Sequence, residues 1–357
     1  MNETATTSSA TMTVGLDVGD RKTHFCLMED DEIKGRGSFE TTQRGLAEAL
    51  REFSGARVAL EAGSQSPWMS RALKAAGFEC HVVDPRRVQL ISKDPRKTDR
   101  RDAEVLAMLE AGVPQLLGSI HHRGEQAQAD MALLRARVQL VGARTSLIQC
   151  VRGLVKAHGE RLPSTAAKCF DSRVRPLIPE ALIPALGPLL DQIESFTVTI
   201  RAYDRQIATL EERYPEVQVL QQVQGVGPLT STAYALTIED PERFKDSRSV
   251  GSFVGLCPRS HASGDSDPEL RISKSGDGYL RGLLVQCAQY ILGPFGQPSD
   301  LRAFGTRLAE RGGRAAKKRA IIAVARKLAV LLHRLWRHDL KYDPHHEENR
   351  KAALAAG

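Results

Sequence analysis

Four acidic residues in the first third of the chain have the side-chain type and spacing that phosphodiester chemistry needs. They are Asp17, Glu61, Asp99 and Asp102. The first two end short apolar stretches, and the last two stand three residues apart, so they would share one face of a helix. Four carboxylates at one place repel one another, and a divalent cation relieves the repulsion. Oxygen ligands suit Mg²⁺, and two such ions about 4 Å apart can activate a nucleophile and stabilise the leaving oxygen.

Each acid also has an ordinary structural explanation. Asp17 could form the turn before Gly19, Glu61 could cap the following helix, and Asp99 could be an N-cap with Asp102 in the first turn. Taken one at a time, these explanations are preferred. Taken together, two acids at strand ends and a D-x-x-D pair are hard to explain as coincidence. The combined pattern therefore predicts a magnesium site.

An α/β pattern of elements would have to position these acids. Strands are expected at 13–17, 23–28, 33–39, 58–61 and 79–83, and helices at 42–53, 67–76 and 97–111. The later strand–helix–strand units favour parallel pairing by right-handed crossovers. This order fits a mixed five-stranded sheet with helices on both faces, in which the first and fourth strands are neighbours. It is the order of the RNase H-like fold, although flavodoxin-like and other α/β arrangements share it.

The middle of the chain, residues 121–216, has a helical pattern. Apolar positions alternate spacings of three and four at Leu186, Leu189, Ile193, Phe196, Ile200, Tyr203, Ile207, Leu210 and Tyr214. This seam predicts a coiled-coil hairpin or a helical dimer contact. The upstream partner helix would carry the cations Arg135, Arg137, Arg144, Arg152 and Lys156. These cations are explained equally by a solvated helix face and by contact with nucleic acid.

A polar loop between residues 258 and 278 combines hydroxyl groups with cations. Its serines are Ser260, Ser263, Ser266, Ser273 and Ser275, and the flanking cations are Arg259, Arg271, Lys274 and Arg281. Arginine and lysine at such a loop could grip phosphates, and a serine hydroxyl could attack phosphorus. Serines in polar loops are usually turn residues, and the residue types alone do not choose among these five.

Two further features indicate a helical, nucleic-acid-binding C-terminal domain. Gly225 and Gly227, in the G-V-G-P turn, are typical of a helix–hairpin–helix, although a plain tight turn explains them equally well. From residue 302 to 337 there are eleven Lys or Arg and one acid, Glu310. We expect phosphate contacts from the cations Arg314, Lys317, Lys318 and Arg319. The alternative is a solvated amphipathic face.

Bulk properties limit the class of protein. A chain of 357 residues predicts two or three domains, and the formal net charge of +7 is a modest sign of nucleic-acid binding. The six cysteines form no C-x-x-C pair, which favours free thiols in a reducing compartment. The first residues lack the pattern of a signal peptide, and no apolar run could span a bilayer, so we expect a cytoplasmic protein without a membrane partner.

The motifs occur in the order found in a known family. They are V-G-L-D-V-G at 14–19, L-E-A-G at 60–63, K-T-D-R-R-D-A at 97–103, G-V-G-P at 225–228, G-L-C-P-R at 255–259, S-G at 263–264 and I-S-K-S-G at 272–276. Over about residues 12–340, the chain resembles the DEDD insertion-sequence transposases with a RuvC-like domain, also called bridge-RNA-guided recombinases. The acidic loop 264–268 and the extension before Thr13 depart from the family pattern.

The resemblance implies a division of the chain and a role for each part. It predicts flexible tails at 1–11 and 344–357, a RuvC-like (RNase H-like) catalytic domain at 12–120, a helical region at 121–216 that mediates assembly, and a mainly helical transposase domain at 217–343. The four acids would bind Mg²⁺, and Ser263 would be the nucleophile that forms a phosphoserine link to DNA. The two halves of the site would come from different subunits of a homo-oligomer, a dimer that assembles to a tetramer. A noncoding bridge RNA would pair with donor and target DNA.

Two other functions remain open from the sequence. A plain RuvC-like DNA nuclease or junction resolvase would use the same carboxylates with water as the nucleophile, and its C-terminal domain would only bind DNA. A nucleic-acid-binding scaffold without catalytic activity would need none of the four acids. Their joint presence argues against a scaffold.

Overall fold

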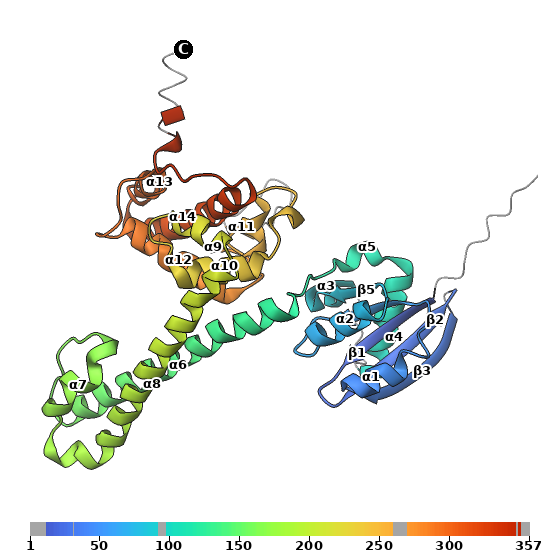
Figure 1. The fold of residues 1–357 in the computed structure, drawn as a ribbon, viewed down its shortest axis with the longest axis horizontal. Helices are drawn as coiled ribbons and strands as arrows, with labels where there is room; N and C mark the ends of the chain where they lie inside the picture. The colour runs from blue at the N-terminus through green and yellow to red at the C-terminus, as the bar shows by residue number, and fades with distance from the viewer. Residues whose placement is uncertain (1–11, 31, 92–97, 260–269, 348, 351–357) are drawn as a thin grey trace, which may run out of the picture. The chain divides into compact units, whose positions relative to one another are not determined.

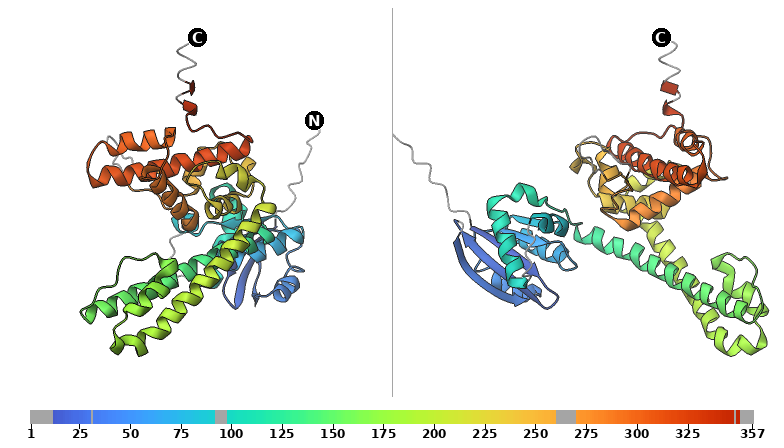
Figure 2. Two further views of the ribbon diagram at one scale, coloured as in Figure 1. Left: turned by 60° about the vertical axis from the view of Figure 1, so that its left-hand side comes forward. Right: turned by 180° about the vertical axis from the view of Figure 1, so that it is seen from behind.

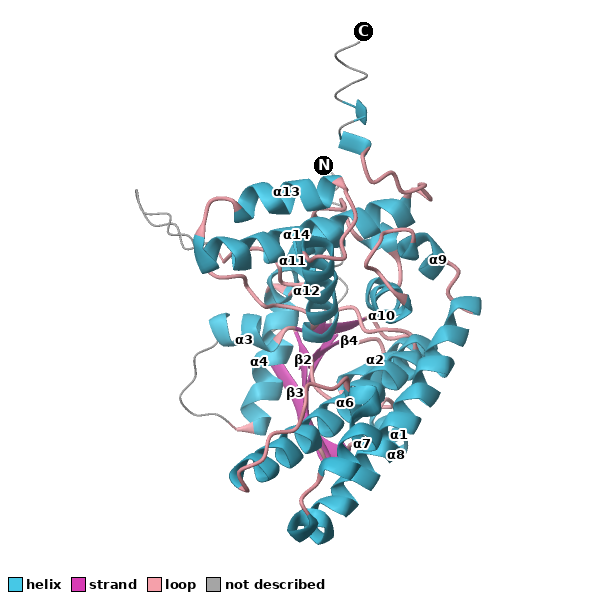
Figure 3. Cartoon of the chain, turned by 90° about the vertical axis from the view of Figure 1, so that its left-hand side faces the viewer, coloured by secondary structure: helices cyan, strands magenta, loops and turns pink. Residues whose placement is uncertain are grey.

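The computed structural model describes residues 12–30, 32–91, 98–259, 270–347 and 349–350. The chain forms two compact units, with the boundary between Glu125 and Gln126, and each unit has its own hydrophobic core (Figure 1). All five strands of the described residues lie in the first unit, and the second is helical (Figure 3).

The first unit is built on a mixed five-stranded sheet. Its strands are β1 (Met12–Val18), β2 (Lys22–Glu29), β3 (Glu32–Glu40), β4 (Arg57–Glu61) and β5 (Cys80–Val83). The spatial order is β3-β2-β1-β4-β5. The first three strands pair antiparallel, whereas β1–β4 and β4–β5 pair parallel. The predicted sheet, with its first and fourth strands as neighbours, is confirmed.

Helices cover both faces of this sheet. They are α1 (Gln43–Ala49), α2 (Ser66–Ala75), α3 (Pro85–Ile91), α4 (Asp99–Gly112) and α5 (Pro114–Leu117). Residues of α1 and α2 share a core with Val14, Leu16 and Leu60, while α4 packs on Cys26 and Met28 of the opposite face. The right-hand view of Figure 2 shows α4 against the sheet. Two short helices, α3 and α5, were not expected from the sequence.

Two long helices begin the second unit and form a hairpin. They are α6 (Glu125–Ala157) and α8 (Ile183–Thr209). Short elements connect them: η1 (Ala167–Cys169), α7 (Phe170–Val174), η2 (Arg175–Leu177) and η3 (Glu180–Leu182). A core around Phe170 joins both long helices at the connecting end.

The predicted seam on α8 is partly wrong. Leu190 and Thr197 are buried, whereas Leu189 and Phe196 are only half-buried. Near its start, α8 packs against the connecting segment, residues 167–182, as well as against α6. This additional contact shifts the line of buried residues on α8 by about one position. Supercoiling of the two helices remains a prediction.

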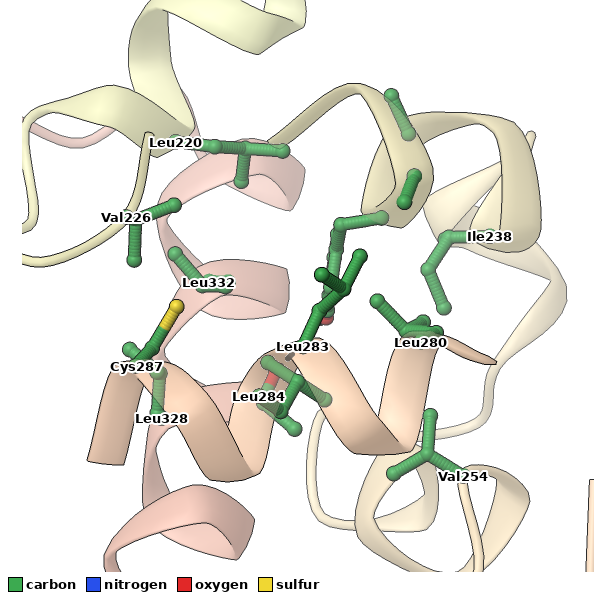
Figure 4. Close-up of a cluster of buried hydrophobic side chains, with 14 of the residues drawn as sticks. Leu220, Val226, Ile238, Val254, Leu280, Leu283, Leu284, Cys287, Leu328 and Leu332 are labelled. Atoms are coloured by element: carbon green, nitrogen blue, oxygen red, sulfur yellow. Dashed lines mark hydrogen bonds between the residues drawn. The ribbon is translucent and has the colours of Figure 1, made fainter. Parts of the chain in front are cut away.

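The remaining helices of the second unit surround one large core. After η4 (Leu210–Glu212) come α9 (Glu216–Gln221), α10 (Pro228–Ile238), η5 (Pro241–Arg243), α11 (Ser249–Phe253), α12 (Gly278–Leu292), α13 (Asp300–Ala309) and α14 (Gly313–Arg337). Figure 4 shows Leu284 and Cys287 of α12 close to Leu328 and Leu332 of α14. Residues at the base of the hairpin, such as Leu134, enter the same core, so the hairpin and the C-terminal helices form one unit.

Part of the segment from residue 344 is bound to α13. The backbone N–H of Asp300 donates to the carbonyl of Pro344, and the N–H of Glu347 donates to a carboxylate oxygen of Asp300. All six cysteines are within the described ranges and are free thiols. No helix among the described residues is long and apolar enough to cross a membrane.

Candidate functional site

Asp17 and Glu61 lie in register on neighbouring parallel strands. Leu16 of β1 pairs with Leu60 of β4, and each acid is the next residue along its strand. Side chains alternate along a strand, so Asp17 lies on the same face as Gly15, the face covered by α4. Glu61 follows the same alternation in β4. Both acids are half-buried at the end of their strands.

The other two acids occupy the first turn of α4. Thr98 is the N-cap of this helix, because its hydroxyl accepts a hydrogen bond from the N–H of Arg101. Asp99 and Asp102 therefore lie inside the helix, where the positive end of the helix dipole favours carboxylates. Asp99 is exposed and Asp102 is half-buried. The alternative role of Asp99 as an N-cap is excluded.

Gly15 sets how closely α4 approaches the strand that carries Asp17. A Cβ atom on Gly15 would lie 2.1 Å from the carbonyl oxygen of Ala103 and 2.4 Å from the nitrogen of Ala107. Only glycine permits this contact between backbones. The close packing brings the first turn of α4 to the face of the sheet that carries Asp17 and Glu61.

His24 is a further residue at this edge, and it was not among the residues predicted from the sequence. It is the cross-strand partner of Asp17, and its Nε2 lies 3.8 Å from an oxygen of Asp99. The alternation of β2 could have identified it, because Cys26 and Met28 on the same face are buried under α4. His24 therefore links the strand acids to the helix acids.

These residues do not form a closed metal cage. Within the part of the chain that the structure describes, no three His, Cys, Asp or Glu side chains are gathered closely enough to hold a metal ion. The donor set nevertheless suits Mg²⁺, because all four predicted ligands are carboxylates at one edge of one sheet face.

Ser263 lies outside the described residues, as do Ser260 and Ser266. The two ends of their loop are described and are joined as a short antiparallel neck. The N–H of Arg259 donates to the carbonyl of Arg271 at 3.0 Å, and the N–H of Ser273 donates to the carbonyl of Cys257 at 2.9 Å. The loop therefore leaves and rejoins the unit at one place.

Glycines hold the base of this neck. Gly255 and Gly276 have φ values of +69° and +70°. A Cβ on Gly255 would lie 2.2 Å from the carbonyl oxygen of Ser275, and one on Gly276 would lie 1.9 Å from that of Phe253. The motifs G-L-C-P-R and I-S-K-S-G thus pack directly on each other.

The predicted phosphate-binding cations around the neck have different surroundings. Arg259, Arg271 and Lys274 are exposed. Arg281 donates from Nη1 to the carbonyls of Val254, at 3.0 Å, and Ser275, at 2.8 Å. Its guanidinium therefore joins the two ends of the loop, a structural role that the sequence did not indicate.

The G-V-G-P turn joins α9 to α10. Gly225 has φ +93°, and a Cβ there would lie 2.8 Å from a ring carbon of Tyr290. Gly227 is the N-cap of α10, and Pro228 is its first residue. The turn connects two consecutive helices, and both the helix–hairpin–helix motif and phosphate binding by the two glycines remain predictions.

The predicted basic face of α14 is at the surface. The four cations Arg314, Lys317, Lys318 and Arg319 are exposed, while Ala316 and Ala320 between and after them are buried.

Three of the five cations predicted on α6 contact other residues of the hairpin, whereas Arg135 lies 3.9 Å from Asp277 at the start of α12. Arg137 pairs with Asp204, and Arg144 donates to the hydroxyl of Thr197 at 3.1 Å. Arg152 donates to the carbonyls of Leu162 and Pro163. These side chains support the hairpin structure.

Comparisons with known proteins agree with the motifs. A DEDD transposase model matches residues 14–159, and a model described as the transposase IS116/IS110/IS902 family matches residues 217–300. The chain is 29% identical to the transposase for insertion sequence element IS1111A of Coxiella burnetii, over 77% of this chain and 76% of that protein. It is 30% identical to a probable family 20 transposase of Pseudomonas aeruginosa, over 71% and 76% of the two chains.

A third relative is named for a different role. The pilin gene-inverting protein of Moraxella lacunata is 30% identical over 43% of this chain and 48% of its own length. The two matching models and the relatives together lead to one assignment: this chain belongs to the IS116/IS110/IS902 family of insertion-sequence transposases, and its DEDD match covers the first unit and continues through α6 of the second.

Proposed function

We propose that this transposase cleaves and exchanges DNA strands with a magnesium-binding carboxylate site and a serine nucleophile. The observation that carries the proposal is the placement of Asp17 and Glu61, in register on β1 and β4, on the face that receives the first turn of α4. Asp99 and Asp102 are in that turn. These four residues would hold Mg²⁺, which when bound neutralises charge on the reacting phosphodiester.

Ser263 is the proposed nucleophile, by its place in the S-G pair after G-L-C-P-R. Its oxygen would form a bond to phosphorus as the bond from phosphorus to one bridging oxygen breaks. The phosphoserine link would keep the phosphodiester energy for rejoining to a second strand. The hydrogen bonds between residues 257–259 and 271–273 bring together the two family motifs that flank this serine in the sequence.

The finer parts of the proposal concern partners. By family resemblance, a noncoding bridge RNA selects donor and target DNA, and a homo-oligomer supplies the carboxylates and the serine from different subunits. The exposed cations of α14 and of the neck, among them Lys318 and Arg259, would contact phosphates. The helical region at 121–216 would mediate assembly, and the transposase domain at 217–343 would carry the nucleophile.

Ser263→Ala tests the chemical step. With the element's RNA and labelled donor and target DNA, this variant should lose covalent protein–DNA adducts by several orders of magnitude, since the attacking atom is gone. Its affinity for DNA and RNA should stay unchanged. Ser266→Ala, in the same loop, is the matched control and should form adducts normally. Asp17→Asn should also lose adducts while keeping its affinity.

Two outcomes would overturn the proposal. Adducts formed by Ser263→Ala at the normal rate would exclude this serine as the nucleophile. Cleaved DNA that carries a free 5′-phosphate and no attached protein would favour hydrolysis by water, as in a RuvC-like nuclease. Sequencing of the RNA that co-purifies with the chain from its native locus tests the RNA partner.

A further inference from the structure

We propose that a cavity in the second unit binds an unpaired base of single-stranded DNA. The cavity has a volume of about 300 Å³ and lies between the α9–α10 turn, the last turn of α12, the segment between α12 and α13, and the segment after α14. We call it the α12 pocket, and its polar lining consists of Gln222, Gln224, Tyr290, Gln297, Ser299 and Tyr342. The proposal rests on the proposed function in one respect, which is that strand exchange makes unpaired DNA available.

The chemistry of the lining suits a nucleobase. Three glutamine amides, two tyrosine rings and one serine hydroxyl supply the polar side-chain atoms, and none of the described residues around the pocket carries a charged side chain. A phosphate or carboxylate is bound best by arginine and lysine, which this lining lacks. A nucleobase is uncharged and planar, with hydrogen-bond donors and acceptors at its edge. Aromatic rings stack on the face of a base, and glutamine amides can pair with its edge.

Hydrogen bonds hold the walls of the pocket in place without a ligand. The N–H of Tyr342 donates to Oε1 of Gln222 at 2.8 Å, which joins the segment after α14 to the end of α9. The guanidinium of Arg302 donates to the carbonyl of Ile291 at 2.6 Å and to that of Gly293 at 2.7 Å, which joins α13 to the end of α12. A site that is formed before binding takes up its ligand at a lower entropy cost.

Tyr290 combines a ring fixed by packing with an exposed surface. A Cβ on Gly225 would lie 2.8 Å from a carbon of this ring, so the G-V-G-P turn packs against it. The residue nevertheless remains 40% exposed. An aromatic ring that is both fixed and exposed can stack on a base.

Phe295 provides a second, independent sign of a stacking partner. It directly precedes Gly296 of the pocket lining and is 74% exposed, the highest exposure of any large hydrophobic residue in the described ranges. An apolar ring in water is unfavourable, and stacking on a neighbouring base would remove its surface from water.

The pocket excludes a paired base and favours a base within a strand. In a duplex, each base is stacked and paired, so only an unpaired base can enter a protein pocket. Gln224 of the lining directly precedes the G-V-G-P turn, where we predict contact with phosphate. A free nucleotide would have to place its phosphate without a charged side chain in the lining, whereas a strand can have its backbone outside the pocket.

The test compares two single-stranded DNA probes of equal length. One carries bases of mixed sequence, and the other consists of abasic sites, which keep the phosphates and remove the bases. Fluorescence anisotropy measures the Kd of the full chain for each probe. Tyr290→Ala should weaken binding of the first probe by about 5- to 150-fold, as expected for the loss of one stacked base, and leave binding of the second unchanged. Tyr290→Phe keeps the ring and should bind both probes like the natural chain.

A second variant protects the test against misfolding. Gln297 is exposed and lies outside the helices, so Gln297→Ala should not disturb the fold. Loss of its hydrogen bond to a base edge should weaken binding of the base-containing probe by about 2- to 12-fold. The matched control is Gln286→Ala, which changes an exposed glutamine of α12 that does not line the pocket and should bind both probes normally.

Three results would overturn the proposal. The first is natural affinity of both Tyr290→Ala and Gln297→Ala for the base-containing DNA probe. The second is an equal loss of affinity for the abasic probe, and the third is a loss seen with RNA of the same sequence and absent with DNA. Failure of the proposed function is observed separately, because it appears as adduct formation by Ser263→Ala and leaves these affinities unchanged.

Discussion

Gly15 is the residue on which the geometry of the carboxylate edge depends most directly. The backbone of α4 lies where a side chain on Gly15 would be, with the carbonyl of Ala103 only 2.1 Å from the position of a Cβ. Neither backbone can yield without moving the helix or the strand. A larger residue would therefore move the first turn of α4, with Asp99 and Asp102, away from Asp17.

We predict that Gly15→Ala destabilises the first unit by about 1–3 kcal/mol, the usual cost of overpacking a core. Urea unfolding followed by the fluorescence of Trp68 measures this, because the other tryptophan, Trp336, is in the second unit. Gly112→Ala is the control, since a Cβ on Gly112, in α4, meets no atom within 4 Å. Equal stability of the two variants would contradict the proposed close packing.

At the scale of elements, α4 is anchored at both ends. Its first turn meets the carboxylate edge, and Glu110 near its last turn is fully buried between strands. The Nδ1 atom of His81 in β5 lies 2.9 and 3.0 Å from the two Glu110 oxygens. Arg57 of β4 donates to the Glu110 carbonyl at 3.2 Å, and its Nε lies 3.6 Å from the carboxylate. The contacts join one helix to two strands.

We predict that Glu110→Ala lowers the free energy of unfolding of the first unit by about 3–5 kcal/mol, because it leaves Arg57 and His81 without their buried carboxylate. The same Trp68 signal measures the change. Glu48→Ala is the control: Glu48 pairs with Arg44 on the surface, and such pairs contribute about 0–1 kcal/mol. A small effect at Glu110 would show that hydrophobic packing alone positions α4.

At the scale of the whole molecule, the described part of each unit contains one histidine whose pKa is lowered. Burial is the main cause for His122 in the first unit and for His333 in the second. His333 is fully buried, 2.9 Å from the hydroxyl of Ser247 and 3.0 Å from the carbonyl of Pro241. Below the unfolded value of 6.5, the unfolded chain binds more protons than the folded chain.

Both units should therefore lose stability as the pH falls below about 6.5, and this decrease should end at the lower pKa of the folded state. Urea unfolding at a series of pH values separates the units, with Trp336→Phe isolating the Trp68 signal and Trp68→Phe isolating that of Trp336. His122→Gln should flatten the pH dependence of the first unit only, and His333→Gln that of the second only. An unchanged pH dependence in either variant would contradict the role of that histidine.

The sequence by itself determined the order of elements and the place of the acids along them. Short apolar or alternating stretches predicted all five strands, and the two acids lie where expected, Asp17 as the penultimate residue of β1 and Glu61 as the last of β4. Local sequence patterns did not predict where every helix ends or which of its residues are most deeply buried. The helix expected at 42–53 stops at Ala49, and Phe53 is buried in the core from the turn that follows. Leu190 is more deeply buried than Leu189 in α8, and both pack against the core to which the connecting segment contributes Phe170.

Only the tertiary structure decided which side chains meet. His24 faces Asp99 because two antiparallel strands and a distant helix share one face, and no local pattern contains that information. Arg281 joins the ends of its loop because residues 254 and 275 come together in space. Arg71 donates to the carbonyl of Arg123, which is 52 residues away along the chain. The periodicity of apolar residues shows which face of a helix or strand is buried. Which residues pack against that face depends on how the whole unit folds.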